Sequence, residues 1–228
     1  MQNLIEDGSL RDKLFVFHDR QAAGLLLARN LSRYKGKDVI VLGIPSGGVP
    51  VAAEIVKALM LSLDVIIVRK LQIPYNPEAG FGAVGPDGEV VFNKELLKRL
   101  YLSEREMKRQ IHETKDTIAR RSKLFRKKRP FPSLKNRVVI LVDDGLASGY
   151  TMRAAVNFVR RQEPQKIVVA VPTGSKGTVD SLLVHVDELV CLNVRSGYPF
   201  AVAEAYENWY DLGDEEVISI LQDFPARK

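Results

Sequence analysis

Two adjacent carboxylates, Asp143 and Asp144, mark the part of the sequence where chemistry is most plainly expected. They follow the aliphatic, β-branched run of residues 138–142, which is typical of a strand buried on both faces of a parallel sheet. Residues 145–151 (Gly-Leu-Ala-Ser-Gly-Tyr-Thr) then form a loop of small and hydroxyl residues that leads into a helix beginning near Thr151. Such a loop binds anions, because the free N–H groups and the dipole of the helix N-terminus both favour negative charge.

Carboxylates beside an anion-binding loop suit a ligand that carries both hydroxyls and phosphate. Ribose 5-phosphate is such a ligand, since the two acids can accept hydrogen bonds from its 2- and 3-hydroxyls while the loop holds its phosphate. A plain strand–turn–helix with an Asp as helix cap would need neither the second acid nor the Ser-Gly-x-Thr pattern.

The stretch from Asp143 to Thr151 resembles the phosphoribosyl diphosphate (PRPP) signature of the type I phosphoribosyltransferases, and is most similar to a branch with no assigned acceptor. The Phe-x-Asp-Arg-x-x-Ala-Gly pattern of residues 17–24 is similar to the same branch. The resemblance implies that Asp143 and Asp144 are catalytic residues that hold the ribose. It also implies a 5-phosphate site formed by Ala147, Ser148, Gly149, Tyr150 and Thr151.

A second candidate ligand loop follows the strand expected over residues 38–44 and precedes a helix expected over residues 49–61. Its two glycines would let the backbone approach an oxyanion closely. In the family that this chain resembles, the corresponding loop holds the diphosphate of PRPP, which implies Ser46, Gly47 and Gly48 as diphosphate-binding residues. Related sequences usually carry Arg where Ser46 stands, and the loop here therefore has less charge with which to hold a diphosphate.

Two cations, Arg69 and Lys70, end the third expected strand, residues 63–68. The carboxyl ends of strands in an open α/β sheet face the ligand crevice, so these cations are expected to bind PRPP. Because adjacent side chains on a strand point to opposite faces, one of the two should face the ligand. The resemblance favours Lys70, as a catalytic residue on the diphosphate. The alternative is a solvated strand end.

The alternation of strands with helices predicts an α/β fold, a doubly wound parallel sheet of about five strands with flanking helices. We expect a single domain over residues 1–228, with an insertion at residues 71–136 that contains a hairpin (82–92) and a long helix (103–128). The insertion takes the place of the family's mobile loop that closes over PRPP. The aromatic-rich residues 194–210 would form either a C-terminal hood over the acceptor or ordinary core.

Charge is distributed unevenly along the chain. The formal net charge is +6, but residues 98–137 carry 15 Lys/Arg against 4 Asp/Glu, so the remainder is mildly acidic. The basic face of the insertion helix is expected to be solvated, because it lacks the interleaved aromatic residues of a nucleic-acid-binding surface. Arg20, next to the expected N-cap Asp19, is likewise expected to be solvated rather than a ligand contact.

The single cysteine, Cys191, lies in an apolar run and is expected to be a buried small hydrophobe. No cysteine cluster supports a zinc site. Residues 1–13 lack the apolar core of a signal peptide, and no apolar run reaches the ~20 residues of a membrane span, so a cytoplasmic protein is expected.

The favoured interpretation is an enzyme that transfers ribose 5-phosphate from PRPP to a nitrogen acceptor, either a nucleobase or an amine, and releases diphosphate. Mg²⁺ is expected as cofactor, bound through PRPP and not directly to protein ligands. A homo-oligomer is expected, and a nucleic-acid partner is not favoured. The alternative is a PRPP- or nucleotide-sensing regulator that binds RNA or DNA through its basic insertion.

Overall fold

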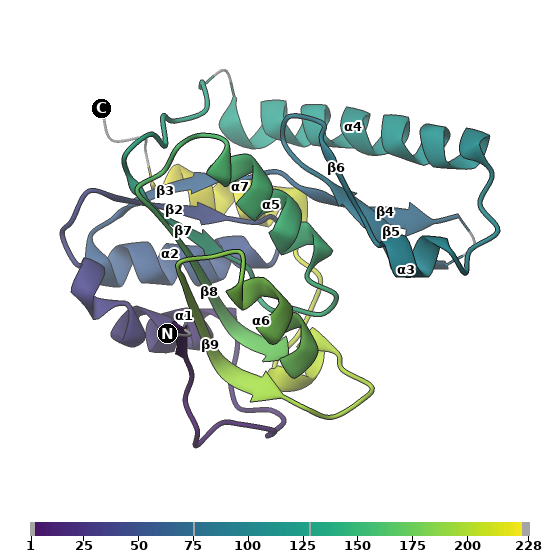
Figure 1. Cartoon of the computed structure of the whole chain (residues 1–228). Helices are drawn as coiled ribbons and strands as arrows, with labels where there is room; N and C mark the ends of the chain where they lie inside the picture. Colours follow the sequence, from purple (N-terminus) through teal and green to yellow (C-terminus); the bar gives the residue numbers. More distant parts are fainter. Residues whose placement is uncertain (1–2, 75, 128, 225–228) are drawn as a thin grey trace.

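A computed structural model describes residues 3–74, 76–127 and 129–224, with the backbone alone described over residues 76–79. Its body is a six-stranded parallel sheet in the order β1-β9-β8-β7-β2-β3 (Figure 1). The strands of this sheet are β1 (Leu4–Ile5), β2 (Val39–Gly43), β3 (Ser62–Val65), β7 (Val138–Val142), β8 (Lys166–Ser175) and β9 (Glu188–Arg195). The predicted α/β class is confirmed. The sheet has one strand more than the predicted five, because β1, with two residues, is too short to produce a periodic pattern.

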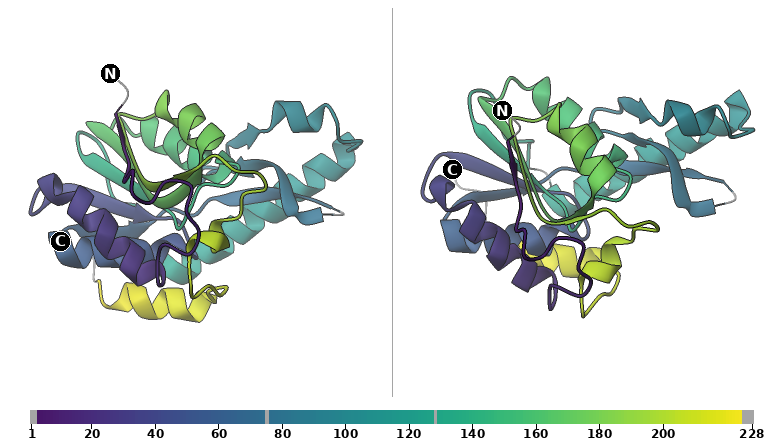
Figure 2. Two further views of the ribbon diagram at one scale, coloured as in Figure 1. Left: turned by 90° about the horizontal axis from the view of Figure 1, so that it is seen from below. Right: turned by 60° about the horizontal axis from the view of Figure 1, so that its bottom comes forward.

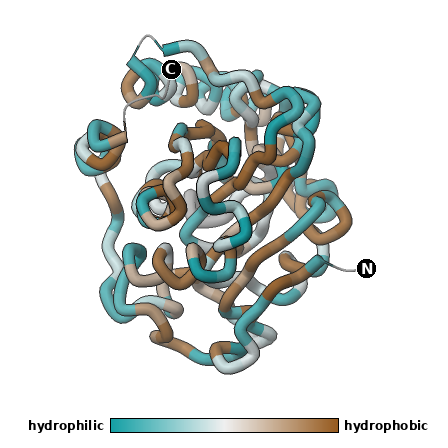
Figure 3. Tube along the Cα trace, turned by 90° about the vertical axis from the view of Figure 1, so that its left-hand side faces the viewer, coloured by the Kyte–Doolittle hydropathy of each residue, from teal (hydrophilic) through white to brown (hydrophobic). Residues whose placement is uncertain are grey.

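Helices cover both faces of the sheet, because alternate strand residues point to opposite faces and both sets are apolar. On one face lie α1 (Arg20–Asn30), the turn η1 (Ser32–Tyr34), α2 (Gly48–Leu59) and α7 (Asp214–Gln222). On the other face lie α5 (Tyr150–Arg160) and α6 (Lys176–Leu183). Figure 3 shows the result as hydrophobic strands in the middle of the body, with hydrophilic segments at its rim. Cys191 lies in the second of these cores, as predicted.

The insertion forms an arm that extends from one side of the body (Figures 1 and 2). Its elements are β4 (Arg69–Ile73), β5 (Asn76–Val84), β6 (Val90–Phe92), α3 (Lys94–Leu97) and α4 (Glu104–Arg126). The three strands form an antiparallel sheet, and the predicted hairpin turn is present, with Gly88 at φ +82°. A capping box of Ser103 and Glu106 starts α4, which agrees with the predicted start of the long helix at residue 103.

The third strand is shorter than the sequence predicts. β3 ends at Val65, and Arg69 and Lys70 begin the arm strand β4 instead of ending a strand of the parallel sheet. The apolar run of residues 63–68 suggests too long a strand, because the connecting residues 66–68 are also buried although they belong to neither sheet.

The N-terminal segment runs beside the chain that follows β9 (Figure 2). β1 pairs with β9, and Phe17 forms a bridge with Tyr206, with their ring centroids 5.7 Å apart. The C-terminal tail, residues 196–213, contains the turn η2 (Val202–Ala205) and returns along the carboxyl edge of the sheet toward α1.

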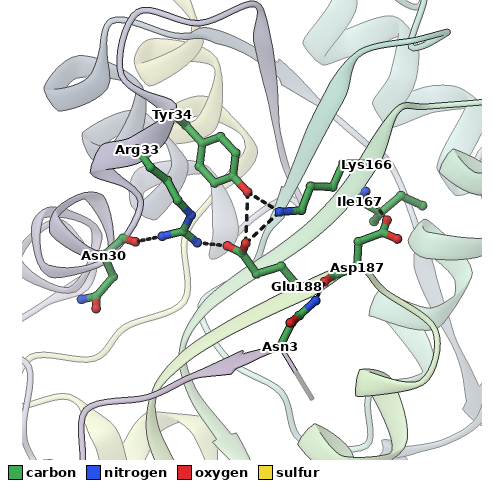
Figure 4. Close-up of polar contacts among 8 residues, drawn as sticks. All are labelled: Asn3, Asn30, Arg33, Tyr34, Lys166, Ile167, Asp187 and Glu188. Carbon is green, nitrogen blue, oxygen red and sulfur yellow. Dashed lines mark hydrogen bonds and ion pairs between the residues drawn. The ribbon is translucent and has the colours of Figure 1, made fainter. Parts of the chain in front are cut away.

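A polar cluster ties α1 to the amino edge of the sheet (Figure 4). The buried carboxylate of Glu188, the first residue of β9, accepts hydrogen bonds from Arg33, from the Tyr34 hydroxyl at 3.2 Å and from the Lys166 ammonium at 2.9 Å. These contacts satisfy a carboxylate that would otherwise be costly to bury. The cluster lies at the amino ends of the strands. The loops that carry the predicted site residues lie at the opposite, carboxyl edge of the sheet.

Candidate active site

Asp143 and Asp144 directly follow the last residue of β7 at the carboxyl edge of the sheet. The Asp143 carboxylate accepts a hydrogen bond of 2.9 Å from the backbone N–H of Asp144. The Tyr206 hydroxyl donates to the backbone carbonyl of Asp144 at 2.6 Å, so the C-terminal tail fixes the strand end from above. Both carboxyl groups are therefore held in defined positions beside the sheet.

The environment of the pair raises the pKa of both acids. Burial raises the pKa of Asp143 well above its usual range, and the neighbouring charge of Asp144 raises it further. Burial also raises the pKa of Asp144, but the guanidinium of Arg20 opposes this effect. A ligand whose hydroxyls donate to the ionised carboxylates would relieve the cost of burying them.

Arg20 is not the solvated helix residue that the sequence analysis predicts. It is 5% exposed, and its Nε donates to Oδ2 of Asp144 at 2.9 Å. Its guanidinium carbon lies 3.9 Å from the centre of the Trp209 ring, and its Nη1 donates to the carbonyl of Tyr210. The prediction fails because the partners of Arg20 come from β7 and from the tail, which are far away in sequence.

The loop between β2 and α2 meets the acidic pair at close range. A Cβ atom on Gly47 would lie 1.8 Å from Oδ2 of Asp144, and one on Gly48 would lie 2.5 Å from the carbonyl of Val142. At Gly48 the clash would be with backbone, so only glycine fits there, and at Gly47 any larger residue would displace the Asp144 carboxylate. Ser46 and these glycines therefore lie directly beside the carboxylates, as parallel neighbours β2 and β7 require. The peptide bond between Pro45 and Ser46 is cis.

The loop from Ala147 to Thr151 is braced from the side of β8 and α6. The carbonyl of Ala147 accepts from the hydroxyl of Thr178 at 2.5 Å, and a Cβ on Gly149 would lie 2.5 Å from a methyl carbon of Thr178. Gly149, at φ +74°, is the N-cap of α5, and no described side chain caps the helix there. The N–H groups of the first turn, which includes Tyr150, have no intrahelical acceptors and suit an anion.

Comparison with known proteins identifies this arrangement. Residues 18–204 match the family described as the phosphoribosyl transferase domain. The chain belongs to the phosphoribosyltransferase family. The match spans the six-stranded parallel sheet, apart from β1, and most of its flanking helices.

Relatives agree with this assignment. A Mycobacterium tuberculosis protein named "Putative phosphoribosyl transferase Rv0571c" is 40% identical over 206 residues, which are 90% of this chain and 46% of the relative. Its counterpart in a second strain, MT0597, matches equally. The chain thus spans about half the length of these curated relatives. The crystal structure of TT1426 from Thermus thermophilus is 39% identical, covers 91% of this chain and 98% of its own, and superposes with a TM-score of 0.73.

The loop at Ser46, which the resemblance predicts to be poor in charge, has a cation beside it. Nη2 of Arg121, on α4 of the arm, donates to the Ser46 hydroxyl at 2.8 Å and to Oδ1 of Asp214 at 2.7 Å. The sequence analysis misses Arg121 and predicts a solvated basic face, although Arg121 and Arg126 are only 4% and 6% exposed. One feature of the sequence indicates that Arg121 is buried: it lies three residues after Ile118 and four before Phe125, on the apolar face of α4.

Arg69, one of the two predicted cations, lies in the electrostatic field of this group. Burial lowers the pKa of Arg69, the charge of Arg121 lowers it further, and Asp214 opposes both. The aliphatic carbons of Lys70 pack on Gly80, where an added Cβ would meet its Cγ at 2.3 Å. The role of Lys70 toward PRPP stays a prediction.

No group of three or more His, Cys, Asp or Glu side chains that could hold a metal ion occurs among residues 3–74, 80–127 and 129–224, whose side chains the structure describes. Within the same ranges, no helix combines the length and the apolar character needed to cross a membrane.

Proposed function

We propose that this phosphoribosyltransferase-family chain transfers ribose 5-phosphate from PRPP to a nitrogen acceptor and releases diphosphate. The observation that carries the proposal is the close approach of two ligand loops: the glycines after β2 touch the acidic pair after β7, and each loop leads into a helix N-terminus. Hydroxyl acceptors and two anion-binding loops then lie within the span of one PRPP molecule.

Each group of residues has a distinct part in this reaction. Asp143 and Asp144 accept hydrogen bonds from the ribose hydroxyls and favour the positive charge that develops on the sugar. Residues 147–151 bind the 5-phosphate with backbone N–H groups at the start of α5. Residues 46–48, together with Arg69 and Lys70, bind the diphosphate.

The reaction exchanges one bond at C1 of the ribose for another. The C1–O bond breaks and the diphosphate leaves with the electron pair, while the acceptor nitrogen forms the C1–N bond and loses a proton. Catalysis comes mainly from positioning and from stabilising the leaving group. Mg²⁺ would neutralise negative charge on the diphosphate when bound, and the carboxylates of Asp143 and Asp144 would accept hydrogen bonds from the waters of such an ion.

Thermal unfolding tests the binding half of the proposal. PRPP with Mg²⁺ should raise the melting temperature, because a ligand that binds only the folded state stabilises it. The double variant Asp143→Asn/Asp144→Asn should lose this shift and still fold. The control is the double variant Asp38→Asn/Asp180→Asn, which changes the same charge at exposed positions away from the site and should keep the shift. A full shift in the first double variant would remove the assignment of the ribose site.

Turnover is tested separately. The protein is incubated with PRPP, Mg²⁺ and pools of nucleobases or amines, and diphosphate release is followed. Release that depends on one pool identifies the acceptor class. Absence of release with every pool, together with intact PRPP binding, would contradict transferase activity. The relatives are named as putative phosphoribosyl transferases, and the comparisons lend no support to the nucleic-acid-binding alternative.

A further inference from the structure

The diphosphate loop contains no charged side chain of its own, but the arm brings one to it. Arg121 is separated from Ser46 by 75 positions in sequence, and its Nη2 nevertheless donates to the Ser46 hydroxyl at 2.8 Å. The loop that would hold the diphosphate is thus contacted by a guanidinium that comes from the arm and not from the sheet.

Arg121 differs from the other basic residues of α4 in its burial. Its side chain is 5% exposed, whereas that of its neighbour Arg120 is 66% exposed. Its guanidinium carbon lies 4.9 Å from the centre of the Phe125 ring, and the buried side chains of Ile118 and Phe125 pack one turn before and one turn after it. The position of the guanidinium is therefore fixed before any ligand arrives, which lowers the cost of binding.

The hydrogen-bonding capacity of this arginine is only partly used. Within the described part of the chain, Nε of Arg121 is buried without a hydrogen-bond partner. An unsatisfied buried donor on a charged group is unfavourable, and native proteins retain such groups rarely. A guanidinium offers five donors in a rigid fork that matches phosphate oxygens. Arg121 thus has donors to spare at the place where a diphosphate would bind.

Positive charge is in excess around Ser46. Arg69 and Arg121 are close enough to act on one another electrostatically, and Arg121 forms an ion pair with Asp214 at 2.7 Å. Arg120 reaches the same carboxylate at 3.7 Å, but its side chain is 66% exposed, so solvent screens its charge. Like charges held together in a partly buried place favour the binding of an anion.

We propose that Arg121 binds the diphosphate of PRPP, taking the part of the arginine that related sequences carry at position 46, and that Asp214 is the counterion it gives up on binding. This inference rests on the proposed function. Nη2 of Arg121 bonds both Ser46 and Asp214, and Asp214 at the start of α7 is 31% exposed, so it can turn to solvent while the buried arginine stays in place. A diphosphate with one Mg²⁺ remains anionic and replaces the carboxylate.

Titration calorimetry with PRPP and with ribose 5-phosphate, each with Mg²⁺, tests the inference, because only PRPP carries the diphosphate. Arg121→Gln should weaken PRPP binding by about 10- to 100-fold, the range for a charge-assisted hydrogen bond, and leave ribose 5-phosphate within about twofold. Arg120→Gln removes the same charge one position away from an exposed side chain, and should reduce PRPP affinity by no more than about threefold.

Equal losses for both ligands in Arg121→Gln, or equal PRPP losses in the Arg121 and Arg120 variants, would overturn the inference and leave PRPP binding by the wild-type protein standing. If the wild-type protein binds PRPP no more tightly than ribose 5-phosphate, the proposed function fails first. The two failures are therefore distinguishable in one set of titrations.

A second variant does not depend on removing the buried arginine. Asp214→Asn frees Arg121 from its counterion and should tighten PRPP binding several-fold, with ribose 5-phosphate unchanged. Glu215→Gln is the matched control, since it removes an exposed carboxylate from the same first turn of α7 and should have little effect. Weaker PRPP binding in Asp214→Asn, or the same gain in Glu215→Gln, would contradict the exchange of counterions.

Discussion

Arg20 and Asp144 form a buried ion pair of 2.9 Å although 124 positions of sequence separate them. The pair joins the first turn of α1 to the acidic end of β7, and the Trp209 ring beneath the guanidinium adds the C-terminal tail to the same contact. Three segments that are distant in sequence, namely α1, the end of β7 and the C-terminal tail, therefore meet at the guanidinium of Arg20. The orientation of the Asp144 carboxylate depends on all of them.

Removing the cation from this pair should destabilise the protein strongly. Arg20→Met leaves the Asp144 carboxylate buried without its partner, a change that costs about 3–5 kcal/mol in comparable pairs. Urea unfolding measures the loss. Arg29→Met, an exposed position on the same helix, should stay within about 0.5 kcal/mol. Equal stability of the two variants would show that the ion pair contributes nothing beyond its surroundings.

The raised pKa of Asp143 predicts that the free energy of unfolding depends on pH, because ionising this buried carboxyl destabilises the folded state. The folded protein holds the proton on this carboxyl more tightly than the unfolded chain does. Between the ordinary aspartate pKa of about 4 and the raised one, stability therefore falls as pH rises. Asp143→Asn cannot ionise. It should be more stable than the wild type at pH 7, and the difference should shrink toward pH 4 in unfolding curves measured across that range. A difference independent of pH would contradict this account.

Gly47→Ala tests the contact between the two ligand loops. The new Cβ would lie 1.8 Å from Oδ2 of Asp144, so the carboxylate must leave its place beside Arg20. PRPP affinity should fall by at least about tenfold, as expected when a charged hydrogen-bonding group is displaced. The control is Gly177→Ala on α6, where a Cβ meets nothing within 4 Å and helix propensity predicts a gain of up to about 1 kcal/mol.

The sequence predicts the parts of this molecule that depend on local patterns. The β-branched runs of β2, β7, β8 and β9 identify buried strands, and the two glycine-containing loops after β2 and β7 indicate where a ligand binds. Parallel strand order then brings those loops together.

Contacts between segments that are distant in sequence could not be predicted from local patterns. Arg20 resembles any arginine near a helix N-cap, because its partners come from β7 and the tail. Arg121 resembles the other cations of a basic helix, and only its place between Ile118 and Phe125 distinguishes it. The residues 66–68 are apolar because they are buried, not because they form a strand.

The Glu188 cluster should contribute stability without affecting the ligand. Glu188→Gln leaves the Lys166 ammonium and the Arg33 guanidinium without their shared carboxylate (Figure 4). A loss of about 1–3 kcal/mol is expected, less than for an enclosed pair because both cations reach solvent. PRPP affinity should be unchanged, since the cluster lies at the amino edge of the sheet. A selective loss of PRPP binding in calorimetry would refute that separation.

The packing of α4 against the body should affect binding of the diphosphate group of PRPP and not binding of its ribose. Ile118 is buried between the arm and the body, and it lies one turn before Arg121 on the same face of the helix. Ile118→Ala removes packing at this point, at a cost of about 2–5 kcal/mol for a buried large-to-small change. The helix can then shift, and Arg121 loses its fixed place beside Ser46. PRPP binding should weaken while ribose 5-phosphate binding is retained.

Leu31→Ala provides the control for this last variant. Leu31 is fully buried at the end of α1, so its truncation should cost similar stability without moving the arm. Both ligands are titrated at a temperature where all three proteins are folded. The ratio of PRPP to ribose 5-phosphate affinity should fall in Ile118→Ala and remain at the wild-type value in Leu31→Ala. If the ratio falls equally in both, general destabilisation explains the effect, and the position of α4 has no special bearing on the diphosphate.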